Sequence, residues 1–198
     1  MENLSKEDAL ILAIPWMHRT FTVYLHEHKV NLENYKEHMG WIQMHLEYMN
    51  TILSAFTEEE KKNLGILITS EEELVEWLKE YGWNEKEDFI PTDSMGTKYS
   101  SQSRSIAPPT AKQLDLEDAL VIALLHIDRK FKSTLRNCKV SEQNLETFKP
   151  MTENHFFVIK PLISALPDEA QKVINQSMIA DEVGLADWVK NVDRDTSY

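Results

Sequence analysis

The sequence predicts an all-α fold, made of two copies of a roughly four-helix unit that pack with pseudo-twofold symmetry. Three observations lead to this expectation. The chain matches itself when it is shifted by 110 residues, its apolar residues recur at helical spacing, and it holds only five glycines among 198 residues. Such a low glycine content argues against a turn-rich β fold.

The internal match is extensive. Between Leu4 and Lys62, 17 of 59 positions are identical to the residue 110 places further on. Mixed composition would give about 6% identity by chance. One extra residue in the second copy moves the offset to 111, and Trp77 then aligns with Trp188. The repeat predicts a tandem duplication, with copy 1 over residues 1–83 and copy 2 over residues 114–198.

The first helix of copy 1 is expected to begin at Ser5, because Ser5 and Asp8 have the spacing of a capping box. Apolar residues then follow at intervals of three and four, as on one face of a helix. The same face recurs in copy 2. The apolar positions are Leu10, Ala13, Ile14, Met17, Phe21 and Leu25 in copy 1, and Leu120, Ala123, Leu124, Ile127, Phe131 and Leu135 in copy 2.

A second helix is expected directly after Asn31 in copy 1 and after Ser141 in copy 2. Gly40 and Pro150 occupy the same position in the two copies. Glycine weakens a helix through its backbone entropy, and proline does so by removing a hydrogen-bond donor. We therefore expect a break or bend at this position of the unit.

Two shorter helices complete the unit. Thr57 and Pro167 stand before acidic residues, a pattern typical of a helix start. Ser70 and Asp181 are the predicted caps of the fourth helix. The large side chains of Trp77 and Trp188 are expected to anchor that helix in the core.

The segment between the copies, residues 84–113, is rich in serine, threonine and proline. It is predicted to be a linker, extended in part at its Pro108-Pro109 pair. One interpretation is a passive tether. The other is a basic arm, containing Tyr99, that docks on the acidic copy 1 or on a partner.

Composition excludes several classes of protein. The longest apolar runs, residues 9–17 and 119–125, are shorter than the roughly 20 residues that span a bilayer. No charged-then-apolar leader precedes them. Cys138 is the only cysteine, so neither a disulfide framework nor a cysteine-based zinc site is expected. We expect a cytoplasmic protein with no membrane contact, no metal and no other cofactor.

The charge is negative and uneven. The whole chain carries −12, and residues 1–90 hold 18 acidic against 8 basic residues, a balance of −10. Residues 114–198 hold 14 acidic against 10 basic residues, a balance of −4. A strongly acidic chain repels phosphate backbones, so direct binding to nucleic acid is disfavoured.

The acidic residues of copy 1 are the main candidate binding site. Solubility and compensation of helix dipoles explain part of this charge, because two acidic triplets fall in first helical turns. The other interpretation is a surface complementary to a basic partner. We call this set the acidic face, and its members are Glu58, Glu59, Glu60, Glu71, Glu72, Glu73, Glu76 and Glu80.

These features predict a protein that is not an enzyme but a protein-interaction module. The most specific form of this prediction is an acidic inhibitor, or immunity-type antagonist, that binds a basic protein such as a nucleic-acid-binding protein. A structural subunit of a larger assembly is an alternative, and it would expose a large apolar patch.

His45 and His155 are the one histidine pair found in both copies. Their place on the apolar stripe favours hydrogen-bonded core histidines. The alternative is that they line a cleft between the repeats, which would make the protein a small-molecule or metal sensor. No Glu-x-x-His or Cys/His metal pattern accompanies them.

One further alternative is an all-α, Mg-dependent nucleotide hydrolase. Residues 72–76 read Glu-Glu-x-x-Glu, and Glu85 and Asp88 follow, which is similar to the magnesium-binding pattern of all-α nucleotide pyrophosphohydrolases. The gap between the two parts is too short, and copy 2 has Val183 and Gly184 at the equivalent place. We therefore favour a solvated acidic helix, and no set of catalytic residues is recognisable.

Overall fold

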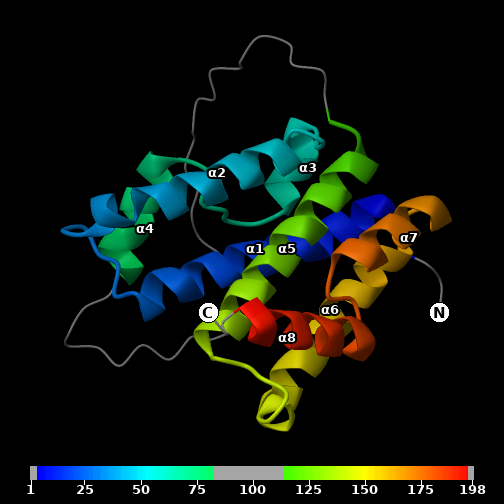
Figure 1. Cartoon of the computed structure of the whole chain (residues 1–198). Helices are drawn as coiled ribbons and strands as arrows, with labels where there is room; N and C mark the ends of the chain where they lie inside the picture. Colours follow the sequence, from blue (N-terminus) through cyan, green and yellow to red (C-terminus); the bar gives the residue numbers. More distant parts are fainter. Residues whose placement is uncertain (1–3, 83–113, 196–198) are drawn as a thin grey trace. The chain divides into compact units, whose positions relative to one another are not determined.

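The computed structural model describes residues 4–82 and 114–195, and within these ranges the chain is all-helical, with no strand (Figure 1). The prediction of an all-α fold is confirmed. The elements of copy 1 are α1 (Lys6–Glu27), η1 (Tyr35–His38), α2 (Met39–Leu53), α3 (Glu58–Asn63) and α4 (Glu71–Tyr81). Those of copy 2 are α5 (Leu116–Asn137), η2 (Leu145–Phe148), α6 (Lys149–Ser164), α7 (Asp168–Ser177) and α8 (Glu182–Asp195). The predicted linker, residues 84–113, lies outside the described ranges.

The two halves of the chain have the same order of elements. α1 and α5 are both 22 residues long. Their first residues, Lys6 and Leu116, are 110 positions apart, since 116 − 6 = 110, and the same offset separates η1 from η2, α2 from α6 and α3 from α7. Between α4 and α8 the offset is 182 − 71 = 111. No helix in the described ranges is long and apolar enough to cross a bilayer.

The first helix of each copy begins at a polar cap. The Ser5 hydroxyl accepts a hydrogen bond from the Asp8 amide at 3.0 Å and donates one to the Asp8 carboxylate at 2.6 Å. In copy 2, Asp115 accepts from the amides of Glu117 and Asp118. These bonds occupy amides that have no partner within the helix, which is why the helices start here.

The connection after the first helix has the same backbone in both copies. Lys29 and Lys139 have φ of 53° and 52°, the left-handed conformation that commonly ends a helix. The side chain of Asn34 accepts from the Asn31 amide at 2.9 Å and donates to the Lys29 carbonyl at 3.1 Å. Asn144 makes the equivalent bonds, to the Ser141 amide and the Lys139 carbonyl.

This turn corrects the predicted start of the second helix. A helix directly after Asn31 or Ser141 is wrong, because an asparagine side chain that bonds the local backbone favours a turn over a helix. Helical structure begins later, with the short 3-10 helices η1 and η2, and it changes to α-helix at Met39 and Lys149. Gly40 and Pro150 follow the change by one residue, so they lie in the first turn of α2 and α6, where a missing amide donor costs little.

The expected caps of the short helices are confirmed. Thr57 with Glu60, and Ser70 with Glu73, form complete capping boxes at the starts of α3 and α4. Asp181 accepts from the Gly184 amide at 2.8 Å in front of α8. Pro167 is extended, at φ −60° and ψ 151°, and stands directly before α7.

The chain forms two compact units that divide within α1. One unit consists of Met1–Met17 together with Asp115–Tyr198, and the other of His18–Leu114. The division differs from the boundaries of the two sequence copies, because the first part of α1 is counted with the elements of copy 2. An ion pair between Lys6 and Glu117 lies inside the first of these units.

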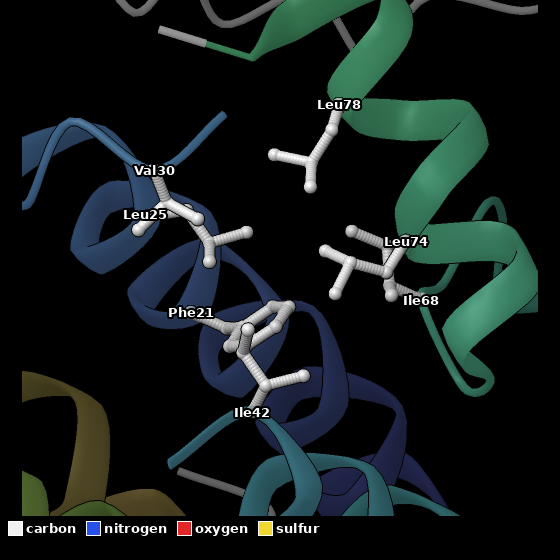
Figure 2. Close-up of a cluster of buried hydrophobic side chains, with 7 residues drawn as sticks. All are labelled: Phe21, Leu25, Val30, Ile42, Ile68, Leu74 and Leu78. Carbon is white, nitrogen blue, oxygen red and sulfur yellow. The ribbon is translucent and has the colours of Figure 1, made fainter. Parts of the chain in front are cut away.

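The unit of His18–Leu114 has a core made by α1, α2 and α4. Figure 2 shows the side chains of Phe21 and Leu25 on α1 directed toward Leu74 and Leu78 on α4. Val30, Ile42 and Ile68 complete this cluster, and Trp77 packs against it while remaining partly buried. A fully buried side chain of this size contributes about 1.5–3 kcal/mol, so this cluster fixes the position of α4 and its glutamates.

In the other unit, a buried carboxylate holds the α7–α8 connection against α5. Asp128 is only 5% exposed, and its Oδ1 accepts from the Ile179 amide at 2.9 Å. Its Oδ2 pairs with Lys132 at 2.7 Å, and Lys132 also donates to the Ser177 carbonyl. Copy 1 has His18 at the position equivalent to Asp128, so this attachment is specific to copy 2.

Candidate functional site

The eight glutamates of the acidic face lie on two helices of one unit. Glu58, Glu59 and Glu60 occupy the first turn of α3, and Glu71, Glu72 and Glu73 occupy the first turn of α4. Glu76 and Glu80 lie further along α4. The partial positive charge of a helix N-terminus stabilises acids in these first turns.

Two of these glutamates are used by the helix caps. The Glu60 carboxylate accepts from the amide and the hydroxyl of Thr57, at 2.6 and 2.7 Å. The backbone hydrogen bond is the larger cause of a lowered Glu60 pKa. The Glu73 carboxylate accepts from both the amide and the hydroxyl of Thr69, each at 2.7 Å, and from the Ser70 amide. These carboxylates are directed at their own backbone, so they serve the fold.

Two more are held in ion pairs. Glu58 pairs with Lys61 at 2.7 Å, and the hydrogen bond from Lys61 lowers the Glu58 pKa. Glu71 pairs with Lys36, and it also accepts from the Tyr35 hydroxyl at 3.1 Å. The hydrogen bond from Lys36 is the first cause of the lowered Glu71 pKa, and that from Tyr35 is the second. Both pairs reduce the charge that the acidic face offers to a partner.

The remaining charge is concentrated on one side of α4. Glu72, Glu76 and Glu80 are all exposed and are spaced by four residues, which places them on neighbouring turns of one helix face. We call these three residues the α4 acidic row. Glu59, on α3, is exposed as well. The equivalents of the row in copy 2 are Val183, Asp187 and Asn191, so copy 2 has no such row.

The magnesium-binding pattern does not form a ligand group in the described part of the chain. The Glu73 carboxylate is committed to Thr69 and Ser70, although Glu72 and Glu76 are exposed. Glu85 and Asp88 lie outside the described residues. Within the described ranges, no three or more histidine, cysteine, aspartate or glutamate side chains are grouped as metal ligands.

His45 and His155 are both buried, each in its own unit, and each lies flat against a phenylalanine. His45 stacks on Phe21 with ring centroids 3.9 Å apart, and His155 stacks on Phe131 at 3.6 Å. His155 Nε2 also donates to the Ile179 carbonyl at 3.3 Å. Burial lowers the pKa of His155 to about 4, so its ring is neutral near pH 7.

Sequence reasoning missed a second group of aromatic residues in copy 1. Tyr24 stacks on Trp41 with centroids 3.5 Å apart, and it contacts His28 at 4.1 Å and His38 at 6.4 Å. We call these four residues the Tyr24 cluster. Burial raises the pKa of the Tyr24 hydroxyl.

The Tyr24 cluster extends the core stack to the surface. Rings succeed one another from exposed His28 to Tyr24, then to Trp41, to Phe21 and to buried His45. Copy 2 keeps only the inner pair, Phe131 and His155, and it has Thr134, Cys138, Phe148 and Met151 at the other positions. The inner pair is therefore present in both halves of the chain, and the outer four residues are present only in copy 1. The sequence signal that could have identified the Tyr24 cluster is this difference between the copies, because aromatic residues and histidines occur at these four positions together only in copy 1.

Comparison of the chain with protein families, with curated proteins and with solved structures finds no match.

Proposed function

We propose that this protein is a non-enzymatic interaction module that binds a basic protein surface through the α4 acidic row. The observation that carries the proposal is the spacing of Glu72, Glu76 and Glu80, three exposed acids on one face of a helix. Like charges four residues apart destabilise a helix by about 0.2–0.5 kcal/mol per pair. The helix N-terminus favours Glu72 but does not reach Glu76 and Glu80, whereas attraction to a basic partner accounts for all three.

The charge balance sets the class of partner. Residues 1–90 carry −10, so nucleic acid is repelled and a cationic protein is attracted. In its most specific form, the proposal is that the protein is an inhibitor or immunity-type antagonist. It would cover the basic surface of a nucleic-acid-binding protein. The association would be fast at low ionic strength and would weaken as salt is added, because exposed charges are screened.

The test is a comparison of two charge reversals with the same change in net charge. One variant is Glu72→Lys/Glu76→Lys/Glu80→Lys. The control is Glu142→Lys/Glu146→Lys/Glu153→Lys, which reverses three exposed acids of copy 2. Each chain is immobilised and exposed to native lysate at about 50 and 500 mM salt, and retained proteins are identified by mass spectrometry.

We expect the wild-type chain and the control to retain the same basic protein at low salt and to release it at high salt. The α4 variant should lose that protein, and titration of the purified protein should then show a fall in affinity. Equal retention by both variants, or retention that does not depend on salt, would contradict the proposal.

We also propose that the two halves arose by tandem duplication. Several repeated details support this: the offset of 110 to 111 between elements, the left-handed Lys29 and Lys139, and the stacked Phe–His pairs. An experimental structure tests it, because residues 6–53 and 116–163 should superpose with matching turns and caps. A different backbone path at Lys139 would argue against common descent of the copies.

A further inference from the structure

Two imidazoles meet at the connection between α1 and α2. His28 follows the last residue of α1, and His38 is the last residue of η1, directly before α2. Their ring centroids are 6.1 Å apart, with an angle of 56° between the planes. The left-handed Lys29 and the Asn34 turn reverse the chain between them, so the backbone itself brings the pair together.

The Tyr24 ring positions both imidazoles. His28 packs against this ring with centroids 4.1 Å apart, and His38 meets it edge-on at 6.4 Å and 79°. Tyr24 is in turn fixed by its stack on Trp41, at 3.5 Å. Side chains that would otherwise sample many rotamers are thereby restrained, which lowers the entropic cost of binding a common ligand.

The separation of the rings fits a shared metal ion. A metal-bound histidine nitrogen lies about 2.0–2.1 Å from zinc, and the ring centroid lies about 1.1 Å beyond it. Two imidazoles on one ion therefore have centroids about 5.2 Å apart at a tetrahedral angle, and about 6.4 Å apart when they lie on opposite sides of the ion. The observed 6.1 Å lies between these values and corresponds to a wide angle at the metal, so tetrahedral zinc would need the ring of exposed His28 to move about 1 Å closer to His38. In the described part of the chain, neither imidazole makes a hydrogen bond or ion pair that would compete for its nitrogens.

We propose that His28 and His38 bind a divalent transition-metal ion of the zinc and copper type. Imidazole nitrogen suits these ions, and they are attracted further by the net charge of −12. The exposure of His28 gives the ion a route to the site. Because the described ranges hold no group of three or more metal-binding side chains, the site has two protein ligands and leaves positions open to water.

Copy 2 shows that the fold does not require this pair. The positions equivalent to His28 and His38 are Cys138 and Phe148, and Tyr24 and Trp41 correspond to Thr134 and Met151. The turn between these positions is nevertheless the same in both copies, with Lys139 at φ 52°. The two histidines are therefore an addition to a turn that forms without them.

The test is calorimetric titration of the untagged full chain with zinc chloride in chelator-free buffer. Wild-type protein should bind one zinc ion per chain at this site. His28→Ala and His38→Ala should each weaken binding by about tenfold or more, since loss even of an outer-shell group costs about 10–100-fold. His26→Ala, which removes a histidine two residues from His28, is the matched control and should bind within about twofold of wild type.

A second readout reports the location directly. Copper quenches tryptophan fluorescence at short range, and Trp41 stacks on the tyrosine that contacts both histidines. The quenching should be lost in His28→Ala/His38→Ala and strongly reduced in Trp41→Phe, while circular dichroism shows that each variant retains its helices. Wild-type zinc affinity in either single alanine variant, an equal loss in His26→Ala, or no zinc binding by the wild-type chain would overturn the proposal.

Discussion

His155 lies flat on Phe131, with ring centroids 3.6 Å apart, and its Nε2 donates to the Ile179 carbonyl. The contact joins α5, α6 and the connection before α8 in one buried group. Copy 1 repeats the stack with His45 on Phe21. A neutral imidazole can stack on an apolar ring in this way, whereas a protonated one would have to lose its hydration inside the core.

The first prediction concerns acid stability. The folded pKa of His155 is about 4, below its ordinary 6.5, so the unfolded chain binds the proton more readily. The stabilisation by the neutral ring is complete above about pH 6.5 and is lost as the pH falls toward 4, with a full size of about 3 kcal/mol. Urea unfolding at pH 7, 6 and 5 should show this loss.

His155→Phe keeps a ring on Phe131 and removes the titrating group. We expect lower stability at pH 7, because the Ile179 carbonyl loses its partner, together with a shallower fall in stability toward pH 5. Equal slopes in wild type and His155→Phe would show that His155 does not titrate as described.

The second prediction concerns the buried carboxylate of Asp128. Asp128→Ala leaves the Ile179 amide and the Lys132 ammonium without their acceptor. Breaking a buried pair from one side costs about 3–5 kcal/mol, so the free energy of unfolding should fall by roughly 3 kcal/mol. Asp187→Ala, at an exposed position, should change it by less than about 0.5 kcal/mol. Chemical denaturation of both variants measures the difference, and similar values for the two would refute this role.

The third prediction concerns the left-handed turn after α5. Lys139 has φ of 52°, a conformation that costs a residue with a side chain about 1–2 kcal/mol and costs glycine little. Lys139→Gly should therefore stabilise the protein by about 1 kcal/mol. Lys190→Gly, inside α8, should instead destabilise it by about 1 kcal/mol. Thermal unfolding distinguishes the signs, and destabilisation by Lys139→Gly would mean that the turn adopts another conformation.

The fourth prediction separates binding from folding in the α4 acidic row. Glu76→Lys replaces two repulsive pairs, with Glu72 and Glu80, by two attractive ones, so α4 should gain roughly 0.5–1 kcal/mol. The same substitution should weaken binding to a basic partner. A variant that is more stable but binds less would show that the row was placed for recognition. Unchanged affinity in a stabilised variant would argue that these glutamates serve solubility.

Much of the helical pattern could be predicted because it depends on residues close in sequence. Apolar spacing of three to four marks the α1 and α5 stripes, and Thr57 and Ser70 mark the starts of α3 and α4. The error lay at Asn31, where the periodic apolar pattern continues but the Asn34 side chain bonds the backbone of Lys29. At this position, hydrogen bonds between a side chain and the local backbone favour a turn, although the apolar spacing is typical of a helix.

The candidate sites were only partly predictable. The acidic face could be read from composition, but composition could not show that Glu60 and Glu73 are turned toward their own caps. The Tyr24 cluster was missed because its members come from two helices and the turn between them. The structure shows that its rings stack, in copy 1, onto the Phe–His pair that both copies contain.

By itself, the sequence determined that the chain is helical, where most of its helices lie and where they are capped, and it suggested that the second half repeats the first. These properties follow from interactions within a few residues and from direct comparison of the copies. Only the tertiary structure decided that Met1–Met17 joins Asp115–Tyr198 in one compact unit. It likewise decided that His28 and His38 meet beside Tyr24. Such contacts depend on how buried faces pack and on which way a turn reverses the chain, and short-range spacing encodes neither.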